Sequence, residues 1–321
     1  MAGVLLAFAY PDRIARRRSG SDNRFLMSSG RGAVFTEAEP LAAADTLVAA
    51  HLDGAAEARI YLAASLNLEQ LLTYHAAHVT EVTEVVWDER EHCVQARRQQ
   101  RIGELVLTDR RWEEAPAAAL ESALLEGIRR AGPGVLPWNE AARACQSRIA
   151  FLQRLSPQDW PDVSDAALLA TLDDWLLPYL AGMSRLAHLQ RLDLQAAMLA
   201  LLPWEQQRQL DELAPSHCTV PSGSRIRLDY SQAQPVLAVR LQEMFGLQQT
   251  PRVGGGKVPV LIHLLSPAQR PVQITQDLAA FWKGSYHAVR KEMKGRYPKH
   301  HWPEDPLQAQ PTTRTRRRTG K

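Results

Sequence analysis

The sequence predicts a multidomain α+β protein, in which a small closed β-barrel, a helical connector and a C-terminal α+β domain follow one another along the chain. Three changes of pattern predict this fold class. Short β-type runs broken by glycine turns occupy residues 21–114, Ala- and Leu-rich helical periodicity occupies 115–216, and strand-like runs return over 217–306. With 321 residues, 45% of them hydrophobic, the chain is long enough to bury two or three cores.

The first part of the chain combines the end of a helix with a series of short strands. Residues 3–18 are apolar and then arginine-rich, which predicts the end of a helix, so we expect the chain to begin partway through a larger fold. A further helix is predicted over 67–75. The predicted strands lie within 25–35, 47–52, 59–66, 82–88, 92–99 and 102–108. Several short strands around one helix are typical of a closed barrel of the OB type, which we assign to 21–114.

The rest of the chain alternates between helical and mixed patterns. After Ser164 and Asp165, which are good capping residues, apolar residues at helical spacing predict one helix through Leu180. Beyond residue 217 we expect strands within 225–230, 258–265 and 272–274 and a helix over 236–245. A final amphipathic, basic helix should begin near Asp277. Residues 307–321 lack an apolar anchor, so we expect a disordered basic tail.

Basic residues are concentrated at the two ends of the chain. The formal net charge is only +3, but residues 1–32 carry six arginines against two aspartates. Residues 283–321 carry 11 Lys or Arg against three acidic residues. The centre is therefore acidic. This asymmetry is expected of a protein that binds a polyanion, and the alternative is that the charges only keep the chain soluble.

Cysteine usage and hydropathy indicate the expected cellular location of the protein. Cys93, Cys145 and Cys218 are far apart and form no C-x-x-C pair, so we expect neither a disulfide framework nor a zinc knuckle, and a reducing cytoplasm is the expected location. No run approaches the roughly 18 to 20 apolar residues that cross a bilayer, so we expect no membrane partner.

Two segments resemble nucleotide-handling motifs and fail on spacing. The Gly254–Lys257 cluster lacks the upstream glycine and the following Ser or Thr of a phosphate-binding loop, and it is interpreted as a flexible turn. In Asp88–His92 the histidine comes one residue too late for an Asp-Glu-x-His motif, and without a phosphate-binding loop such a match cannot hydrolyse ATP. We interpret it as a charged hairpin turn.

Two other clusters contain residue types found in metal sites or catalytic sites, but their spacing does not fit. His75 and His78, followed by Glu81, would present metal ligands only if one helix continued through two β-branched residues, so we interpret the histidines as surface or capping residues and predict no metal site. Ser222-Gly-Ser224 lacks the pattern of a nucleophile elbow and is predicted to be a turn before a strand.

The cations near the barrel and in the last helix are the candidate binding residues for single-stranded nucleic acid. Arginine guanidinium groups suit phosphates, and basic residues interleaved with aromatic ones suit a strand with exposed bases. The alternatives are a solvated barrel surface and, for Trp302, a place in the core. The candidates are Arg16, Arg17, Arg18, Arg31, Arg97, Arg98, Arg290, Lys291, Lys294, Arg296 and Lys299.

Several sequence blocks together resemble one protein family. They are VPSGSRIRLDY at 220–230, PVLAVRLQEMFGL at 235–247, HLLSPAQRPVQITQD at 263–277 and GRYPKHHWPEDP at 295–306, with YPDRIARRR at 10–18 and SGRGA at 29–33. These blocks are similar to the C-terminal region of the HrpB-type DEAH-box ATP-dependent RNA helicases of bacteria. None of them is a catalytic motif.

The resemblance implies an RNA-contacting part that couples the grip on RNA to RecA-like motor domains, which this sequence lacks. Residues 1–20 would then end a helical-bundle domain. ATP and magnesium are expected only with the motor domains, so no catalytic residue and no cofactor is assigned to this chain. The competing hypothesis is a stand-alone module that docks a protein partner or RNA and has no catalytic activity.

Overall fold

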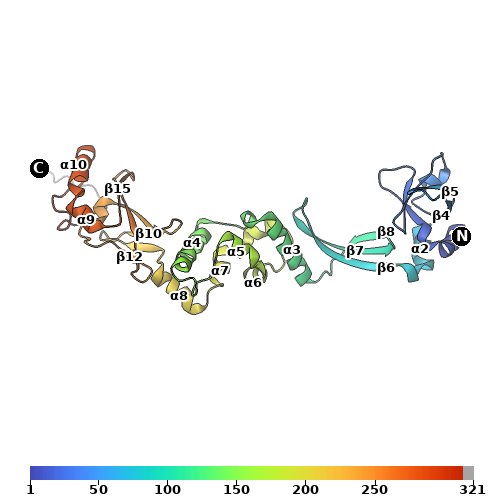
Figure 1. The fold of residues 1–321 in the computed structure, drawn as a ribbon, viewed down its shortest axis with the longest axis horizontal. Coiled ribbons are helices and arrows are strands. Elements are labelled where there is room, and N and C mark those ends of the chain that lie inside the picture. The colour runs from blue at the N-terminus through green and yellow to red at the C-terminus, as the bar shows by residue number, and fades with distance from the viewer. Residues whose placement is uncertain (314–321) are drawn as a thin grey trace. The chain divides into compact units, whose positions relative to one another are not determined.

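The computed structural model describes residues 1–313 and divides into two compact units (Figure 1). The first unit contains Met1–Gly127 together with the short segment Gly182–Arg185. The second contains Ile128–Ala181 and the chain from Leu186 onward. The mixture of strands and helices confirms the predicted α+β class. Among residues 1–313, no helix has the length and apolar character that crossing a membrane requires.

A closed five-stranded barrel forms the start of the first unit. Its strands follow the order β1-β2-β3-β5-β4, and β1 pairs with β4 to close the ring. All neighbours are antiparallel except β3 and β5. The interior is filled by alternating apolar residues such as Phe25, whose ring meets that of Phe35 edge-on at 5.8 Å. The strands are β1 Ile14–Arg17, β2 Arg24–Met27, β3 Gly32–Val34, β4 Thr46–Leu52 and β5 Glu57–Ser65.

The first barrel strand was predicted to be helical, and that prediction was wrong. The helix α1 ends at Ala9, because Pro11 disfavours a helical backbone at Tyr10. A 3₁₀ turn, Pro11–Arg13, then leads into β1. Helix α1 (Ala2–Ala9) packs with α2 (Leu68–Tyr74) over a core that includes Val4, Leu71 and Leu107. Short 3₁₀ turns also occur at Pro40–Ala43 and Ala76–His78.

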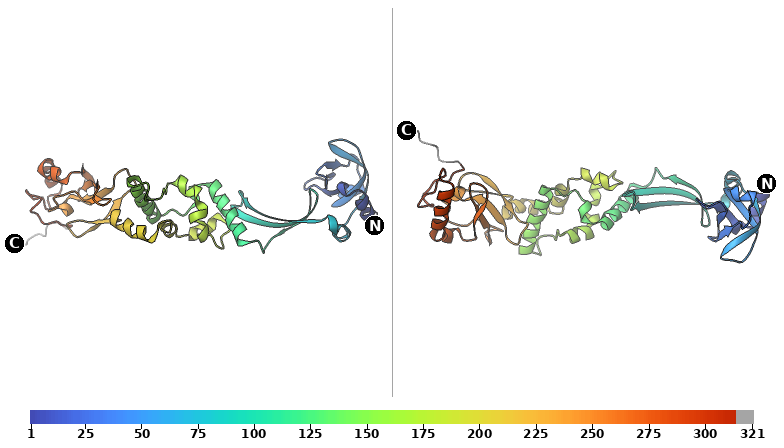
Figure 2. Two further views of the ribbon diagram at one scale, coloured as in Figure 1. Left: turned by 60° about the horizontal axis from the view of Figure 1, so that its bottom comes forward. Right: turned by 90° about the horizontal axis from the view of Figure 1, so that it is seen from above.

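The sequence predicts that the strands after residue 80 belong to the barrel, and this is wrong. They form a separate antiparallel sheet. Strands β6 (Thr80–Asp88), β7 (Cys93–Ile102) and β8 (Leu105–Arg111) lie side by side along their length (Figure 2). The barrel is already closed by β1, which leaves no edge for them to pair with. Every residue of β7 between its two ends is half-buried, so along the middle of β7 neither face is covered as a core face would be.

The first part of helix α3, through Gly127, and a distant segment complete the first unit. The indole of Trp87, on β6, packs against Gly127 of α3 (Ala117–Ala131). Ser184 accepts a hydrogen bond from the backbone N–H of Val94 (2.8 Å) and thereby extends the edge of β7. Cys93 forms a single β-bridge with Arg185.

The second unit begins with short helices packed around the longer helix α4 (Glu140–Leu155). The helix predicted through Leu180 is broken into α5 (Asp165–Ala170), α6 (Leu172–Trp175) and a 3₁₀ turn. The Trp175 indole N–H donates to the Leu168 carbonyl, which takes the place of a regular helical bond (2.9 Å). The remaining elements are α7 Leu194–Leu199, α8 Trp204–Leu213 and the 3₁₀ turns Pro133–Val135, Leu177–Tyr179 and Leu186–Arg191.

A five-stranded sheet of order β15-β14-β11-β10-β9 follows the helices in the second unit. Residues 236–245 were predicted to be a helix, and this was wrong, because β11 (Val236–Arg240) is the central strand and pairs in parallel with β14. A short apolar run does not distinguish a buried strand from a helix. The other elements are β9 His217–Thr219, β10 Arg225–Asp229, β14 Leu261–Leu265, β15 Pro271–Thr275, the hairpin β12 Arg252–Val253 with β13 Val258–Pro259, and the 3₁₀ turn Leu241–Met244.

The last helical segment is two helices and not one. Helix α9 (Leu278–Lys283) ends at Gly284, and α10 (Tyr286–Arg296) starts again at once. The chain then returns to the segment that follows β11, where the N–H of Gly246 donates to the Pro306 carbonyl and the N–H of Thr312 donates to the Gln242 carbonyl (both 3.0 Å). Residues 307–313 are therefore held against the domain, which corrects the prediction of disorder over that stretch. Residues 314–321, the rest of the predicted tail, lie outside the described residues.

Candidate nucleic-acid interface

Arg16, Arg17 and Arg18 line one cleft of about 540 Å³ next to the barrel, together with the turn that follows them and Asp45. Arg17 is held by Asp45, with 2.8 Å between Nη2 and Oδ1. Arg16 donates to the carbonyls of Val106 and Leu107 and so ties the barrel to β8. The Arg18 side chain is exposed and makes no ion pair or side-chain hydrogen bond within residues 1–313. Of the three, Arg18 is the one whose guanidinium is available.

The other predicted arginines of the first unit are partly engaged. Arg31 Nη2 donates to the Ala55 carbonyl at 2.6 Å. Arg98 pairs with Glu81 (3.2 Å) and Glu114 (3.7 Å) and lies over the Trp112 ring. Arg97 has one loose ion pair, 3.7 Å from Asp109. The charge of Arg98 is thus neutralised within the sheet, whereas that of Arg97 is only partly so.

The predicted cations of α10 separate into structural and exposed groups. Arg290 Nε donates to the Trp302 carbonyl and Nη2 meets Glu304, both at 3.1 Å. Trp302 is 7% exposed and its indole N–H donates to the Tyr297 carbonyl, so it belongs to the core. Lys291 and Lys294, three residues apart on the outer face of the helix, are exposed.

Two more predicted cations lie at the end of α10. Arg296 is exposed, with its guanidinium 3.1 Å from Glu292. Lys299 is exposed in the segment that follows the helix. Within the described chain no ion pair neutralises Lys291, Lys294 or Lys299. The helix therefore presents lysines that are free to meet an anion.

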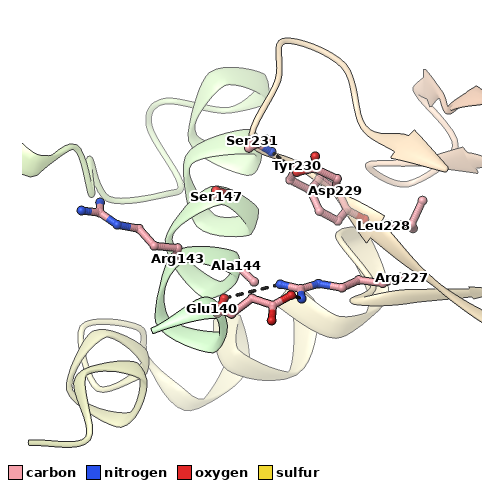
Figure 3. Close-up of a pocket in the computed structure, with 9 residues that line it drawn as sticks. All are labelled: Glu140, Arg143, Ala144, Ser147, Arg227, Leu228, Asp229, Tyr230 and Ser231. Carbon is pink, nitrogen blue, oxygen red and sulfur yellow. Dashed lines mark hydrogen bonds and ion pairs between the residues drawn. The ribbon is translucent and has the colours of Figure 1, made fainter. Parts of the chain in front are cut away.

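A second cleft, of about 370 Å³, lies between α4 and β10 and was not anticipated from the sequence (Figure 3). In it Arg227 and Glu140 turn toward each other and form an ion pair, while Arg143 points away. Arg143 lies over the Trp138 ring at 3.6 Å and pairs with Asp165 at 2.8 Å. Because these charges neutralise one another, the cleft offers no unpaired cation for a phosphate.

The glycine cluster and the acidic segment are turns, as predicted. Gly254, Gly255 and Gly256 have positive φ angles of 64°, 65° and 81° in the connection from β12 to β13. Asp88 ends β6, and its Oδ1 accepts from the backbone N–H groups of Glu91 (3.1 Å) and Arg90 (2.9 Å). These two bonds lower the pKa of the Asp88 carboxyl and keep it ionised in the hairpin.

The histidines and serines have structural surroundings. His75 caps the C-terminus of α2 but is buried and not on the surface, with the Phe8 ring at 4.0 Å and Nε2 3.3 Å from the Val4 carbonyl. Over residues 1–313, no three His, Cys, Asp or Glu side chains form a group that could hold a metal ion. Ser222 precedes a turn at Gly223 and donates to Glu243 Oε2 at 2.9 Å, in agreement with the predicted turn before a strand.

Sequence reasoning identified Arg97 but missed two further arginines that lie beside it in the first unit. Arg97, Arg111 and Arg185 line a gap of about 220 Å³ at the edge of the β6–β8 sheet. Arg111 could have been found from the strand register. Arg185 could not, since it comes from the distant segment that pairs with β7.

Comparison with known proteins gives consistent matches along the chain. A family model described as "ATP-dependent helicase C-terminal" matches residues 175–306, and one described as "ATP-dependent RNA helicase HrpB, connector region" matches residues 78–112. The chain is 43% identical over 318 residues to the ATP-dependent RNA helicase HrpB of Escherichia coli (strain K12), a match that covers 98% of this chain and 39% of that protein.

Two solved structures are similar as well. The crystal structure of the E. coli DExH-box NTPase HrpB matches with a TM-score of 0.62 and 42% identity, over 98% of this chain and 39% of that one. The crystal structure of the Escherichia coli DEAH/RHA helicase HrpB matches with a TM-score of 0.54 and 39% identity, over 94% of this chain and 38% of that one. The chain thus spans about two fifths of the length of these relatives.

Proposed function

Because the chain belongs to the HrpB family of helicases and corresponds to the connector and C-terminal regions of its members, we propose that it is the RNA-contacting part of such a helicase. The family match confirms the resemblance of the sequence blocks at 10–18, 29–33 and 220–306. In this proposal the chain grips single-stranded RNA and transmits that grip to RecA-like motor domains.

The main support for RNA contact is that some of the candidate cations have no ion-pair partner within the described chain. Lys291, Lys294 and Lys299 in the second unit and Arg18 in the first expose their charge with no ion pair inside residues 1–313. A folded chain gains nothing from like charges grouped on one helix face, because they repel each other. Contact with a phosphate backbone, which releases counterions, would stabilise them.

The topology of the barrel supports the same function. A five-stranded closed barrel with the order β1-β2-β3-β5-β4 is consistent with an OB-like fold. Such barrels hold single strands with basic grooves and stacking side chains. The cleft lined by Arg16, Arg17 and Arg18 lies beside this barrel, and this position supports Arg18 as a phosphate contact.

ATP binding is assigned to the motor domains and not to this chain. The Gly254–Lys257 turn lacks the Ser or Thr that would hold magnesium, with Val258 in that position. We therefore expect the purified chain to show no RNA-stimulated ATP hydrolysis. Measurable RNA-stimulated hydrolysis, abolished by mutation within the chain, would overturn this assignment.

The RNA contact is tested by the fluorescence anisotropy of a labelled 20-nucleotide oligo(U) over a series of salt concentrations. If about five phosphates are contacted, log affinity should fall with log salt with a slope near −3.5, from roughly 0.7 per contact. The double variant K291Q/K294Q should flatten this slope by about 1.4. K257Q, which removes a lysine charge from the loop of the β12–β13 hairpin, serves as the control and should leave the slope unchanged.

The same measurement distinguishes the competing function. A chain that binds no RNA at 20 mM salt, while still folded by circular dichroism, would be a stand-alone module for docking a protein partner. Equal slopes for the wild type and K291Q/K294Q would show that RNA binds, but not on α10.

A further inference from the structure

The gap at the edge of the β6–β8 sheet brings together three arginines from separate parts of the first unit. Arg97 on β7 lies directly opposite Arg111 on β8 in the strand register, so both side chains project from the same face. Arg185 reaches the gap from the segment that pairs with Cys93 and Val94. Like charges directly opposite each other destabilise a sheet unless something neutralises them.

Little within the described chain neutralises this group. The eight residues that line the gap include the three arginines and no Asp or Glu. Arg111 and Arg185 are exposed and have no ion-pair partner among residues 1–313, and Arg97 has only the 3.7 Å contact with Asp109. Glu84, on β6, lies opposite Arg97 in the register, but β7 separates it from Arg111 and it does not line the gap. The gap itself therefore keeps a positive charge.

The opposite face of the same sheet carries a second pair of arginines, and one of them is neutralised by carboxylates. Arg98 and Arg110 also lie directly opposite each other in the register. There, however, Arg98 meets both Glu81 and Glu114 and covers the Trp112 ring. The two faces thus carry the same cross-strand arginine pair with different surroundings: Arg98 meets two carboxylates, whereas Arg97 meets only Asp109 and Arg111 meets none within the described residues.

We propose that Arg97, Arg111 and Arg185 form a binding site for one phosphate group. A guanidinium binds a phosphate through two parallel N–H···O bonds, and three of them around one gap match a tetrahedral anion better than lysines would. A gap of about 220 Å³ is smaller than the roughly 300 to 1,000 Å³ of pockets that enclose a whole small molecule. It therefore suits a phosphate whose remaining part stays outside.

The source of this phosphate is the RNA backbone, and in that respect the site rests on the proposed function. The half-buried, uncovered face of β7 leaves room for a strand to run past the gap. A free inorganic phosphate would satisfy the same three side chains, so the experiment separates the two sources.

The first measurement compares two double variants of the whole chain, each lacking two positive charges. R111Q/R185Q removes two of the three arginines of the gap. R110Q/R191Q removes two exposed arginines that lie elsewhere, Arg110 on the other face of β8 and Arg191 in the second unit. We expect R111Q/R185Q to weaken oligo(U) binding about tenfold at 50 mM salt and to flatten the salt slope by roughly 0.7, as the loss of one phosphate contact requires. The control should keep the wild-type slope.

The second measurement follows the arginine side-chain Nε–H resonances by NMR while inorganic phosphate is added. If RNA binds and both double variants match the wild type, the site is overturned. If the wild type binds no RNA, the proposed function fails, but saturable shifts with phosphate that disappear in R111Q/R185Q would uphold the site with free phosphate as its ligand. Absence of both RNA binding and phosphate shifts overturns it.

Discussion

The indole of Trp87 lies against the bare backbone of Gly127, so that a Cβ added at this glycine would come closer than 3.0 Å to three atoms of the ring. Gly127 sits inside helix α3, where glycine costs about 1 kcal/mol relative to alanine. The close approach of strand β6 to α3 explains why a glycine stands there. This contact fixes the sheet to the helix within the first unit.

Replacing Gly127 by alanine should therefore destabilise the first unit, although alanine is the better helix former. The new methyl group must displace the Trp87 ring, and such overpacking costs about 1 to 3 kcal/mol. Urea unfolding followed by tryptophan fluorescence should show a lower midpoint for the first unit.

Gly295 is the matched control, because it lies in helix α10 and a Cβ added there meets no atom within 4 Å. Gly295→Ala should stabilise the second unit by up to about 1 kcal/mol. A gain in stability for both variants would mean that the indole is not held against Gly127.

Arg148 closes the end of helix α8 from the inside of the second unit. Its Nε donates to the Ala214 carbonyl (2.6 Å) and its Nη2 to the Leu210 carbonyl (3.1 Å), which leaves these C-terminal groups satisfied although buried. Arg148→Met keeps most of the volume but leaves the buried Ala214 carbonyl without a donor, while the Leu210 carbonyl keeps its bond from the backbone N–H of Ala214, so we expect a loss of about 1 to 3 kcal/mol by urea unfolding.

Asp211 provides the control for this prediction. It pairs with Arg148, but its side chain is 77% exposed. Asp211→Asn should cost less than about 1 kcal/mol, because the guanidinium keeps its carbonyl partners. If both variants lost the same stability, the ion pair and not the carbonyl bonds would hold α8.

Stability of the second unit should fall as the pH rises above 9. Burial raises the pKa of the Cys145 thiol from 9.0 to about 11. Between these values the folded chain keeps a proton that the unfolded chain has lost, so the free energy of unfolding decreases with increasing pH. Burial also raises the pKa of Tyr230 and Tyr286, which extends the decrease above pH 10.

Urea midpoints measured from pH 7.5 to 10.5 test this directly. Cys145→Ala removes the thiol and should give a flatter profile between pH 9 and 10 than the wild type. Parallel profiles for the two proteins would show that the thiol ionises as readily in the folded state as in the unfolded one.

Arg290 and Lys294 should separate stability from RNA binding on a single helix. Arg290→Met removes the bonds to Trp302 and Glu304, and we expect a loss of about 1 to 2 kcal/mol with little change in the RNA salt slope. Lys294→Gln should do the reverse, lowering RNA affinity at unchanged thermal stability. A common effect of both variants on either measurement would contradict this division.

Part of this structure follows directly from local sequence chemistry. The turn at Asp88 was predictable because a carboxylate can accept from the N–H groups two and three residues on, and the Gly254 turn because glycine tolerates positive φ. Strand β11 was not predictable, since its apolar residues fit a buried strand and a helix equally well. Pairing with β14, far along the sequence, decides the question.

The candidate site divides in the same way. The exposure of Lys291 and Lys294 follows from helical spacing, because Val289 and Met293 occupy the buried side. The structural role of Arg290 depends on the return of the chain at Trp302, which no local pattern reveals. The meeting of Arg111 with Arg185 likewise depends on a tertiary contact.

The uncovered β6–β8 sheet has a consequence for how this protein can change over evolutionary time. Since the interior positions of β7 are only half-buried, a larger or smaller side chain there neither overfills nor empties a packed cavity. Single side chains at these positions of β7 can therefore change without loosening the barrel or the helices. Side chains that bind a ligand can therefore change at these positions while the packed cores of the protein stay the same.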